Sequence, residues 1–274
     1  MNWHIRAFNR KFFIKKKRAF NYKLVGFLAP NLKGYSMLKK LNILIASTIM
    51  GLMLSGQVAA EKTVQDFQSW GMILATGSFT PTSRFKWWME GHGRFGDDSS
   101  RFSQGIIRPG VGYAVNDQTS LWLGYAWIPT DKPFAAGDRF NEHRIWQQLL
   151  WSNSYSFGTV TARTRTEQRF FDISGSSDVA YRFRQFFKWS IPMPFISSKT
   201  SFILQDEVFV NLNDTEIGIR SGFNQNRFFT GFAYKFSQIV TGELGYLNQY
   251  FNRPENPRPD QMQHIIQANF ILNF

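Results

Sequence analysis

Four charged side chains occupy every second position of one stretch, as Arg163, Arg165, Glu167 and Arg169. In a β-strand alternate side chains point to one face, so these four would line the same side of a sheet. A soluble protein would place that side in water. In a membrane-spanning barrel it would have to face the interior, because an arginine that faces lipid at the bilayer midplane costs about 2–4 kcal/mol. An upstream export signal and an alternating aromatic C-terminus favour the barrel.

The same alternation recurs in other segments and predicts one charged interior face to which several strands contribute. Arginine exceeds the acidic residues in segments 158–171, 178–190 and 223–237. A basic lumen with low-dielectric walls attracts anions, and rings of arginine favour anion passage. The pattern therefore predicts a narrow, porin-like anion-preferring channel or an anion-binding barrel, with small anions as partners. The predicted inward residues are Lys86, Glu90, His92, Arg94, Arg108, Arg163, Arg165, Glu167, Arg169, Arg182, Arg184, Glu207, Arg227, Lys235 and Glu243.

Two other interpretations of these residues stay open. A small barrel can be filled by its own side chains, and the charges would then pair as a plug in a structural or surface-contact barrel. Alternatively, His143 lies near Glu142 and Asp138, as a lipid- or envelope-modifying hydrolase would need. No sequence feature identifies a particular serine as the nucleophile of such a hydrolase, so we predict no catalytic residue.

The sequence predicts no metal and no cofactor. Asp97, Asp98 and Asp138 carry the oxygen ligands that Ca²⁺ prefers, but acidic loop tips are usually just solvated. The chain has no cysteine, which excludes disulfides, thiolate metal sites and a lipid anchor on cysteine.

The formal net charge of +13 is concentrated in the leader. Residues 1–40 hold eleven of the 32 lysines and arginines and no acidic residue, whereas the chain from Glu61 onward has 21 basic and 19 acidic residues. Nucleic-acid binding is therefore not expected of the mature protein. The 29 phenylalanines with a mean hydropathy below zero are instead typical of strands that are half polar and half apolar.

Residues 37–60 have the features of a cleaved signal peptide. Lys39 and Lys40 precede an apolar core from Leu41 to Leu54, which is shorter than the ~20 residues of a membrane-spanning helix. Small residues precede the expected cleavage between Ala60 and Glu61. Because a signal peptide normally begins a chain, the basic residues 1–36 are interpreted as a mis-assigned start. The alternative is an unusually long charged region before the signal.

The mature segment 61–274 is predicted to be an all-β, transmembrane, antiparallel up-and-down β-barrel. Short and long connections alternate, as they do in outer-membrane barrels, and the long ones would face outward. Bacterial barrels have even strand numbers, so we expect about 12 strands, with residues 61–70 supplying an extra one, or alternatively 10. The segments with strand character are 67–80, 84–95, 102–115, 119–129, 141–153, 158–171, 178–190, 199–211, 223–237, 240–252 and 261–274.

Several of these segments resemble a bacterial family of outer-membrane barrels known only as a domain of unknown function, number 2490. The similar stretches are Trp122-Leu-Gly-Tyr125, Arg163-Thr-Arg-Thr-Glu-Gln-Arg-Phe170, Tyr181-Arg-Phe-Arg184, Asp206-Glu-Val-Phe-Val-Asn-Leu212, Asn226-Arg-Phe-Phe-Thr-Gly231 and Glu243-Leu-Gly-Tyr-Leu-Asn-Gln249. The resemblance implies a barrel in the bacterial outer membrane, in contact with its lipid and lipopolysaccharide, and implies no activity. The terminal Phe274 resembles the aromatic signal that the barrel-insertion machinery recognises.

Overall fold

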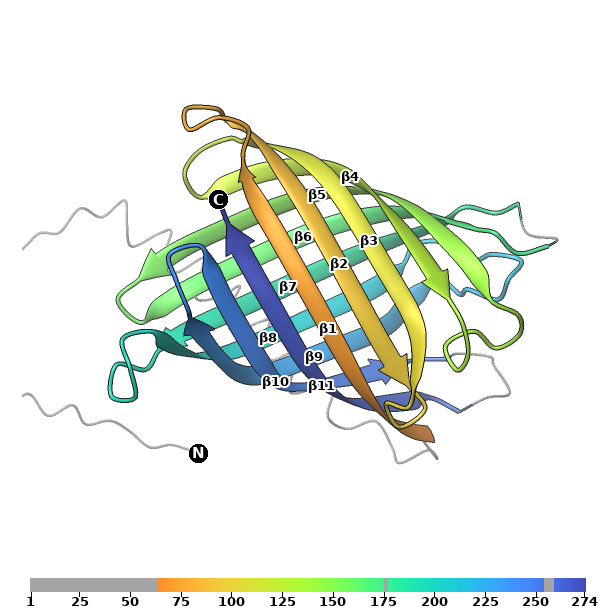
Figure 1. The fold of residues 1–274 in the computed structure, drawn as a ribbon. Helices are drawn as coiled ribbons and strands as arrows, with labels where there is room; N and C mark the ends of the chain where they lie inside the picture. Colours follow the sequence, from red (N-terminus) through yellow and green to blue (C-terminus); the bar gives the residue numbers. More distant parts are fainter. Residues whose placement is uncertain (1–63, 175–176, 254–258) are drawn as a thin grey trace, which may run out of the picture. The chain divides into compact units, whose positions relative to one another are not determined.

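The computed structural model describes residues 64–174, 177–253 and 259–274, which form eleven β-strands closed into a barrel (Figure 1). Among these residues there is no helix long and apolar enough to cross a membrane. The leader 1–36, the signal peptide 37–60 and its cleavage site at Ala60 and Glu61 lie outside the described residues. The strands are β1 (Val64–Ser78), β2 (Phe85–Gly96), β3 (Arg101–Ala114), β4 (Thr119–Thr130), β5 (Phe140–Tyr155), β6 (Gly158–Phe171), β7 (Ala180–Pro192), β8 (Thr200–Asn211), β9 (Gly222–Lys235), β10 (Val240–Phe251) and β11 (Gln261–Asn273).

The barrel closes through a parallel pair, which differs from the all-antiparallel closure expected above. β1 and β11 run side by side in the same direction, from Val64 opposite Gln261 to Thr76 opposite Asn273 (Figure 1). Every other pair is antiparallel. The reason is parity, because an odd number of up-and-down strands leaves the first and last strands pointing the same way. The count of eleven falls between the expected twelve and ten, since residues 64–78 form one continuous strand instead of two.

Connections at one end of the barrel are short, and those at the other are mostly longer. The β5–β6 and β9–β10 connections span residues 156–157 and 236–239, and the C-terminus lies at their end. The opposite end carries the connections 131–139 and 212–221. We call the latter the long-connection end. Val64, the first described residue, lies there too, as the odd strand number requires.

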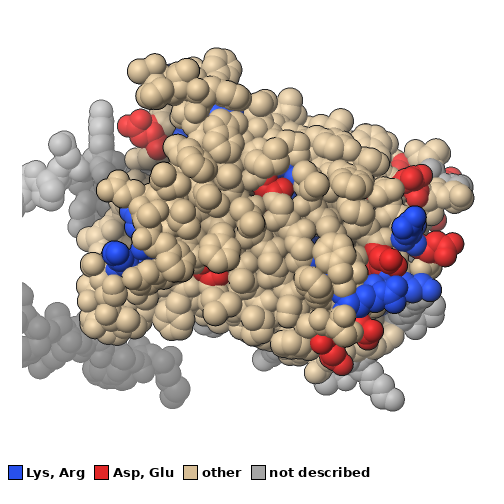
Figure 2. All heavy atoms as spheres, viewed as in Figure 1, with Lys and Arg blue, Asp and Glu red and all other residues tan. Residues whose placement is uncertain are grey.

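The outer wall is apolar along most of its circumference. Side chains such as Ile107, Leu123, Phe232 and Leu244 are each at least half exposed and point outward from the middle of their strands. Charged side chains on the face in Figure 2 are concentrated at the ends of the barrel, above all at the long-connection end. This pattern of apolar side chains outside and polar ones inside follows the two-residue period of the strands.

Tryptophans fill much of the interior toward the short-connection end. Trp88, Trp122 and Trp146 point inward and are at most 6% exposed, and Trp88 packs edge-to-face with each of the other two. Trp88 and Trp122 satisfy their indole N–H groups within their own strands, on Glu90 and Ser120, because residues two apart share a face. Ile203 and Ile265 belong to a second buried apolar cluster on the other side of the interior.

Glycines on β3 and β4 make room for these indole rings. A Cβ atom on Gly124 would lie 2.2 Å from the Trp146 ring and 2.4 Å from the carbonyl oxygen of Pro109. Replacing Gly124 by alanine is therefore expected to lower the free energy of unfolding by about 1–3 kcal/mol, the usual cost of overpacking.

Urea unfolding followed by tryptophan fluorescence measures this cost. Gly71→Ala is the matched control, because a Cβ atom there would meet nothing within 4 Å. The control should change the free energy of unfolding by no more than about 0.5 kcal/mol. Equal effects of the two substitutions would show that the indole packing does not restrict position 124.

Candidate functional site

A cavity of about 630 Å³ occupies the interior from the long-connection end to the middle of the strands. Phe140, Phe171 and Phe251 line its mouth, and Phe186 and Gln205 line its deepest part. A second cavity of about 710 Å³ lies among the long connections and shares Arg169 and other residues with the first. The two cavities together give the interior a route to the long-connection end. The tryptophan cluster occupies the other half of the barrel.

A network of ion pairs forms one side of the interior. Glu167 is 1% exposed, and its carboxylate accepts hydrogen bonds from Arg182 Nη2 at 2.5 Å and from Arg184 Nη1 at 2.6 Å. Arg184 also donates to Glu207 Oε1 at 2.8 Å, and Arg163 Nη2 reaches the same oxygen at 2.8 Å. These side chains come from β6, β7 and β8, which are neighbours in the barrel. Each buried carboxylate is thus held by two guanidinium groups.

Two further carboxylates extend the ion pairs around the wall. Glu142 accepts hydrogen bonds from Arg144 Nε at 2.6 Å and from Arg169 Nε at 2.5 Å. Glu90 accepts a bond from Arg108 Nη1 at 2.6 Å and is also bonded to His92 Nε2. Pairing of this kind offsets much of the cost of burying charge, so these residues contribute to a stable interior as well as to its positive field.

Two arginines at the cavity lack such a partner. Arg94 and Arg227 lie over the ring of Trp70, with Cζ 3.9 Å and 5.1 Å from its centroid. Arg94 Nη1 donates to Gln104 Oε1 at 2.8 Å. Across the described ranges, neither guanidinium forms an ion pair, and the buried Nε atom of each has no hydrogen-bond acceptor. Both residues line the cavity, so the guanidinium donors that are not already bonded within the protein could bind an anionic group there.

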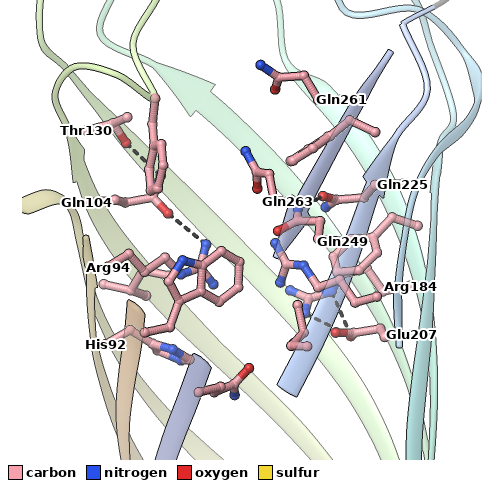
Figure 3. Close-up of a pocket in the computed structure, with 18 of the residues that line it drawn as sticks. His92, Arg94, Gln104, Thr130, Arg184, Glu207, Gln225, Gln249, Gln261 and Gln263 are labelled. Carbon is pink, nitrogen blue, oxygen red and sulfur yellow. Dashed lines mark hydrogen bonds and ion pairs between the residues drawn. The ribbon is translucent and has the colours of Figure 1, made fainter. Parts of the chain in front are cut away.

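Amide side chains surround this pair of arginines. Gln225, Gln249 and Gln263 line the cavity from β9, β10 and β11, and Gln225 and Gln249 are hydrogen-bonded to each other. Figure 3 shows Arg94 and Gln104 on one wall and the three glutamines with Arg184 and Glu207 on the other. An amide can donate and accept, so these groups can bind the neutral polar part of a ligand whose anionic part lies on the arginines.

The structure brings most of the residues singled out in the sequence into this interior. Arg165, Glu167 and Glu243 are inside and buried, but do not line the cavity. Lys86 is half-buried near the short-connection end, and Lys235 is exposed at the last residue of β9, so neither joins the site. Those that line the cavity are Glu90, His92, Arg94, Arg108, Arg163, Arg169, Arg182, Arg184, Glu207 and Arg227.

Sequence reasoning missed several interior residues. Glu142 and Arg144 lie two apart on β5, and this signal was obscured because the next inward residue is the large apolar Trp146. Lys188 continues the alternation of Arg182 and Arg184 on β7 and pairs with Glu243. Trp70 has no charged neighbour on its strand face that would mark it, since its role depends on residues of β2 and β9.

The remaining candidates do not join the arginine site, although Asp97 borders the first cavity and Asp138 the second. His143 is on the outer wall, where its Nδ1 atom is hydrogen-bonded to the hydroxyl of Tyr125. Asp97 and Asp98 form part of the β2–β3 turn with positive φ angles, which aspartate tolerates better than most residues. In the part of the chain that the structure describes, no three His, Cys, Asp or Glu side chains form a group that could hold a metal ion.

Comparisons with known proteins agree with the resemblance noted in the sequence. Residues 67–262 match the family described as "Protein of unknown function (DUF2490)". An uncharacterized protein of Methylorubrum extorquens is 33% identical over 242 residues, which cover 87% of this chain and 100% of that protein. No solved structure matches the chain.

Proposed function

The chain belongs to the DUF2490 family, whose function is unknown, and from this premise we propose that it is an integral outer-membrane β-barrel that binds an oxyanion. The anion would enter from the long-connection end and lie on Arg94 and Arg227. The single observation that carries the proposal is this pair of cavity-lining arginines on Trp70, neither of which forms an ion pair with a carboxylate of the described residues.

The membrane location is supported by the distribution of side chains on the wall. The strands are 12 to 16 residues long, enough for the ~9–11 residues that a tilted strand needs to cross the hydrocarbon core. An apolar outer band around a polar interior is the arrangement of outer-membrane barrels. Phe274, exposed at the end of β11, would present its ring to the insertion machinery. Lipid and lipopolysaccharide would contact the outer band.

Arginine chemistry supports an oxyanion as the ligand. A guanidinium presents donors in a planar fork that matches the two oxygens of a carboxylate or phosphate, and such charge-assisted hydrogen bonds are strong. The paired arginines around the cavity add a positive field that favours entry of anions. A cavity of about 630 Å³ is within the usual range for small-molecule sites, so the ligand would be a phosphate- or carboxylate-bearing small molecule.

A binding cavity fits the interior better than a continuous channel. Trp88, Trp122 and Trp146 pack against one another on the path from the cavity to the short-connection end. Their rings are nearly inaccessible to solvent. A pore would require these rings to separate, whereas a one-ended site needs no such movement.

Two measurements on the detergent-purified protein test the proposal. Titration with inorganic phosphate should give saturable binding and should raise the thermal unfolding temperature, because a ligand that binds only the folded state adds RT ln(1 + [L]/Kd) to its stability. Planar-bilayer recordings under a salt gradient should show no stepwise current.

Each outcome has a distinct meaning. Stepwise anion-selective currents would show that the interior is a channel and not a one-ended binding cavity. Absence of both phosphate binding and current, from a barrel whose gel mobility still changes on heating, would indicate that the arginines serve the structure alone. A change in the lipids of a deletion strain that depends on His143 would instead favour an envelope-modifying enzyme.

A further inference from the structure

One part of the outer wall is polar where the rest is apolar. At the middle of β5 to β9, seven outward side chains carry amide, hydroxyl or carboxylate groups and are only partly exposed. We call them the outer polar belt. They are Gln147, Thr164, Thr166, Gln168, Gln185, Asp206 and Asn226.

Hydrogen bonds link the members of this belt across neighbouring strands. Gln147 accepts a bond from Thr166 Oγ1 at 2.8 Å and donates one to Gln168 Oε1 at 3.0 Å, which joins β5 to β6. Thr164 donates to Gln185 at 2.7 Å, which joins β6 to β7. The belt is therefore continuous from β5 to β7 on the side of the barrel that is farther from the viewer in Figure 1.

The opposite wall has no such feature at the same level. Met89, Ile107, Leu123 and Phe270 point outward from the middle of β2, β3, β4 and β11, and each is about half exposed. Contact with lipid alone explains that wall. It does not explain the belt, since a polar group that faces hydrocarbon is costly unless its hydrogen bonds are made.

Asp206 is the member least suited to lipid. Its neighbour Glu207 points inward to Arg163 and Arg184, so Asp206 must point outward from β8. Its carboxylate accepts a hydrogen bond from Asn226 Nδ2 at 2.8 Å, and no cation in the described ranges forms an ion pair with it. A carboxylate can accept about four hydrogen bonds, so Asp206 has room for further donors.

We propose that a second copy of this chain packs against the outer polar belt in the membrane. A two-fold axis along the membrane normal would place β8 and β9 of one copy opposite β5 and β6 of the other. The Asp206 carboxylate would then face the amide donors of Gln147 and Gln168 in the partner. Amides and hydroxyls both donate and accept, so the belt is complementary to itself, as an isologous interface requires.

The inference rests on the membrane location in the proposed function and not on the anion site. A second copy is chosen over another partner because the two ends of the belt are complementary. One end has the acceptor-only carboxylate of Asp206, and at the other the amides of Gln147 and Gln168 each keep a second N–H beyond the one already bonded within the belt. A folded, heat-modifiable barrel in the outer-membrane fraction would establish the location separately from the dimer.

The absence of native cysteine makes the test direct. Gln185→Cys on β7 lies nearest the proposed two-fold axis, and Leu123→Cys on the apolar wall is the matched control. In membranes treated with a lipid-permeant oxidant, the full chain carrying Gln185→Cys should form a disulfide-linked dimer at about ten times the level of the control, since self-contact concentrates near a two-fold axis.

Substitution of the belt provides the second measurement. The double variant Thr164→Val with Gln185→Leu should raise the dimer dissociation constant in detergent by about tenfold or more. It should leave the barrel folded, because it replaces a matched polar pair by apolar groups. Equal cross-linking of Gln185→Cys and Leu123→Cys, a monomer in membranes and detergent alike, or cross-linking to a different protein would overturn the proposal.

Discussion

Replacing Glu167 by glutamine is expected to lower the free energy of unfolding by about 3–5 kcal/mol, the typical cost of breaking a buried ion pair. The side chain is 1% exposed and is bound by Arg182 and Arg184, with Arg144 3.8 Å away. Glutamine keeps the shape but removes the charge, so Arg182 would be left without an anionic partner in the barrel interior. Urea unfolding in detergent, followed by tryptophan fluorescence, measures the change.

Three variants serve as comparisons for Glu167→Gln. Glu216→Gln makes the same chemical change at an exposed loop position and should alter the free energy of unfolding by no more than about 0.5 kcal/mol. Arg182→Met should cost less than Glu167→Gln, because Glu167 keeps Arg184. The combination of Arg182→Met with Glu167→Gln should cost less than the sum of the two. A value for Glu167→Gln close to that of Glu216→Gln would mean that the network contributes little to stability.

The face of β6 could be predicted because its charges are local and periodic. Arg163, Arg165, Glu167 and Arg169 fall at every second position, and the structure places all four inside. On β5 the same period exists in Glu142, Arg144 and Gln148, but Trp146 interrupts it. The rule that apolar residues face outward therefore fails where aromatic rings fill the interior. The sequence alone does not show which half of the barrel interior contains such rings.

Features that depend on distant strands could not be predicted. Glu207 was predicted to face inward although Asp206 is adjacent, and the partners that hold its carboxylate there, Arg163 and Arg184, come from two other strands. The strand number was judged from a parity rule, although the segments themselves numbered eleven. Closure by the parallel β1–β11 pair depends on both ends of the chain and leaves no local signal.

The site on Trp70 has the same non-local origin. Arg94 belongs to β2, Trp70 to β1 and Arg227 to β9, so the three meet only when the barrel has closed. Charge alternation placed both arginines on inward faces. Charge alternation could not distinguish Arg94 and Arg227 from Arg182 or Arg184, whose guanidinium groups form ion pairs with glutamates. The distinction between a structural arginine and a candidate ligand arginine thus comes from the partners, which the structure supplies.

Replacing Arg227 by glutamine is expected to weaken phosphate binding by about 10- to 150-fold, because a hydrogen bond to a charged group contributes about 1.5–3 kcal/mol. Arg94→Gln should have an effect of the same size, and the double variant should abolish measurable binding. Isothermal titration calorimetry of the detergent-purified protein with phosphate gives the dissociation constants. Arg84→Gln, at an exposed position of the β1–β2 connection, should leave the dissociation constant unchanged.

The stability of the Arg227→Gln variant distinguishes a ligand-binding role of Arg227 from a purely structural one. Arg227 has no ion pair in the described part of the chain, and Glu207 keeps Arg163 and Arg184 when Arg227 is removed. Arg227→Gln should therefore change the urea midpoint little, since Glu207, which lies opposite Arg227 across the β8–β9 pair, keeps its two ion-paired arginines. A variant that lost phosphate binding and also unfolded at lower urea would argue that Arg227 holds the barrel together. A stable variant that bound phosphate normally would place the anion elsewhere.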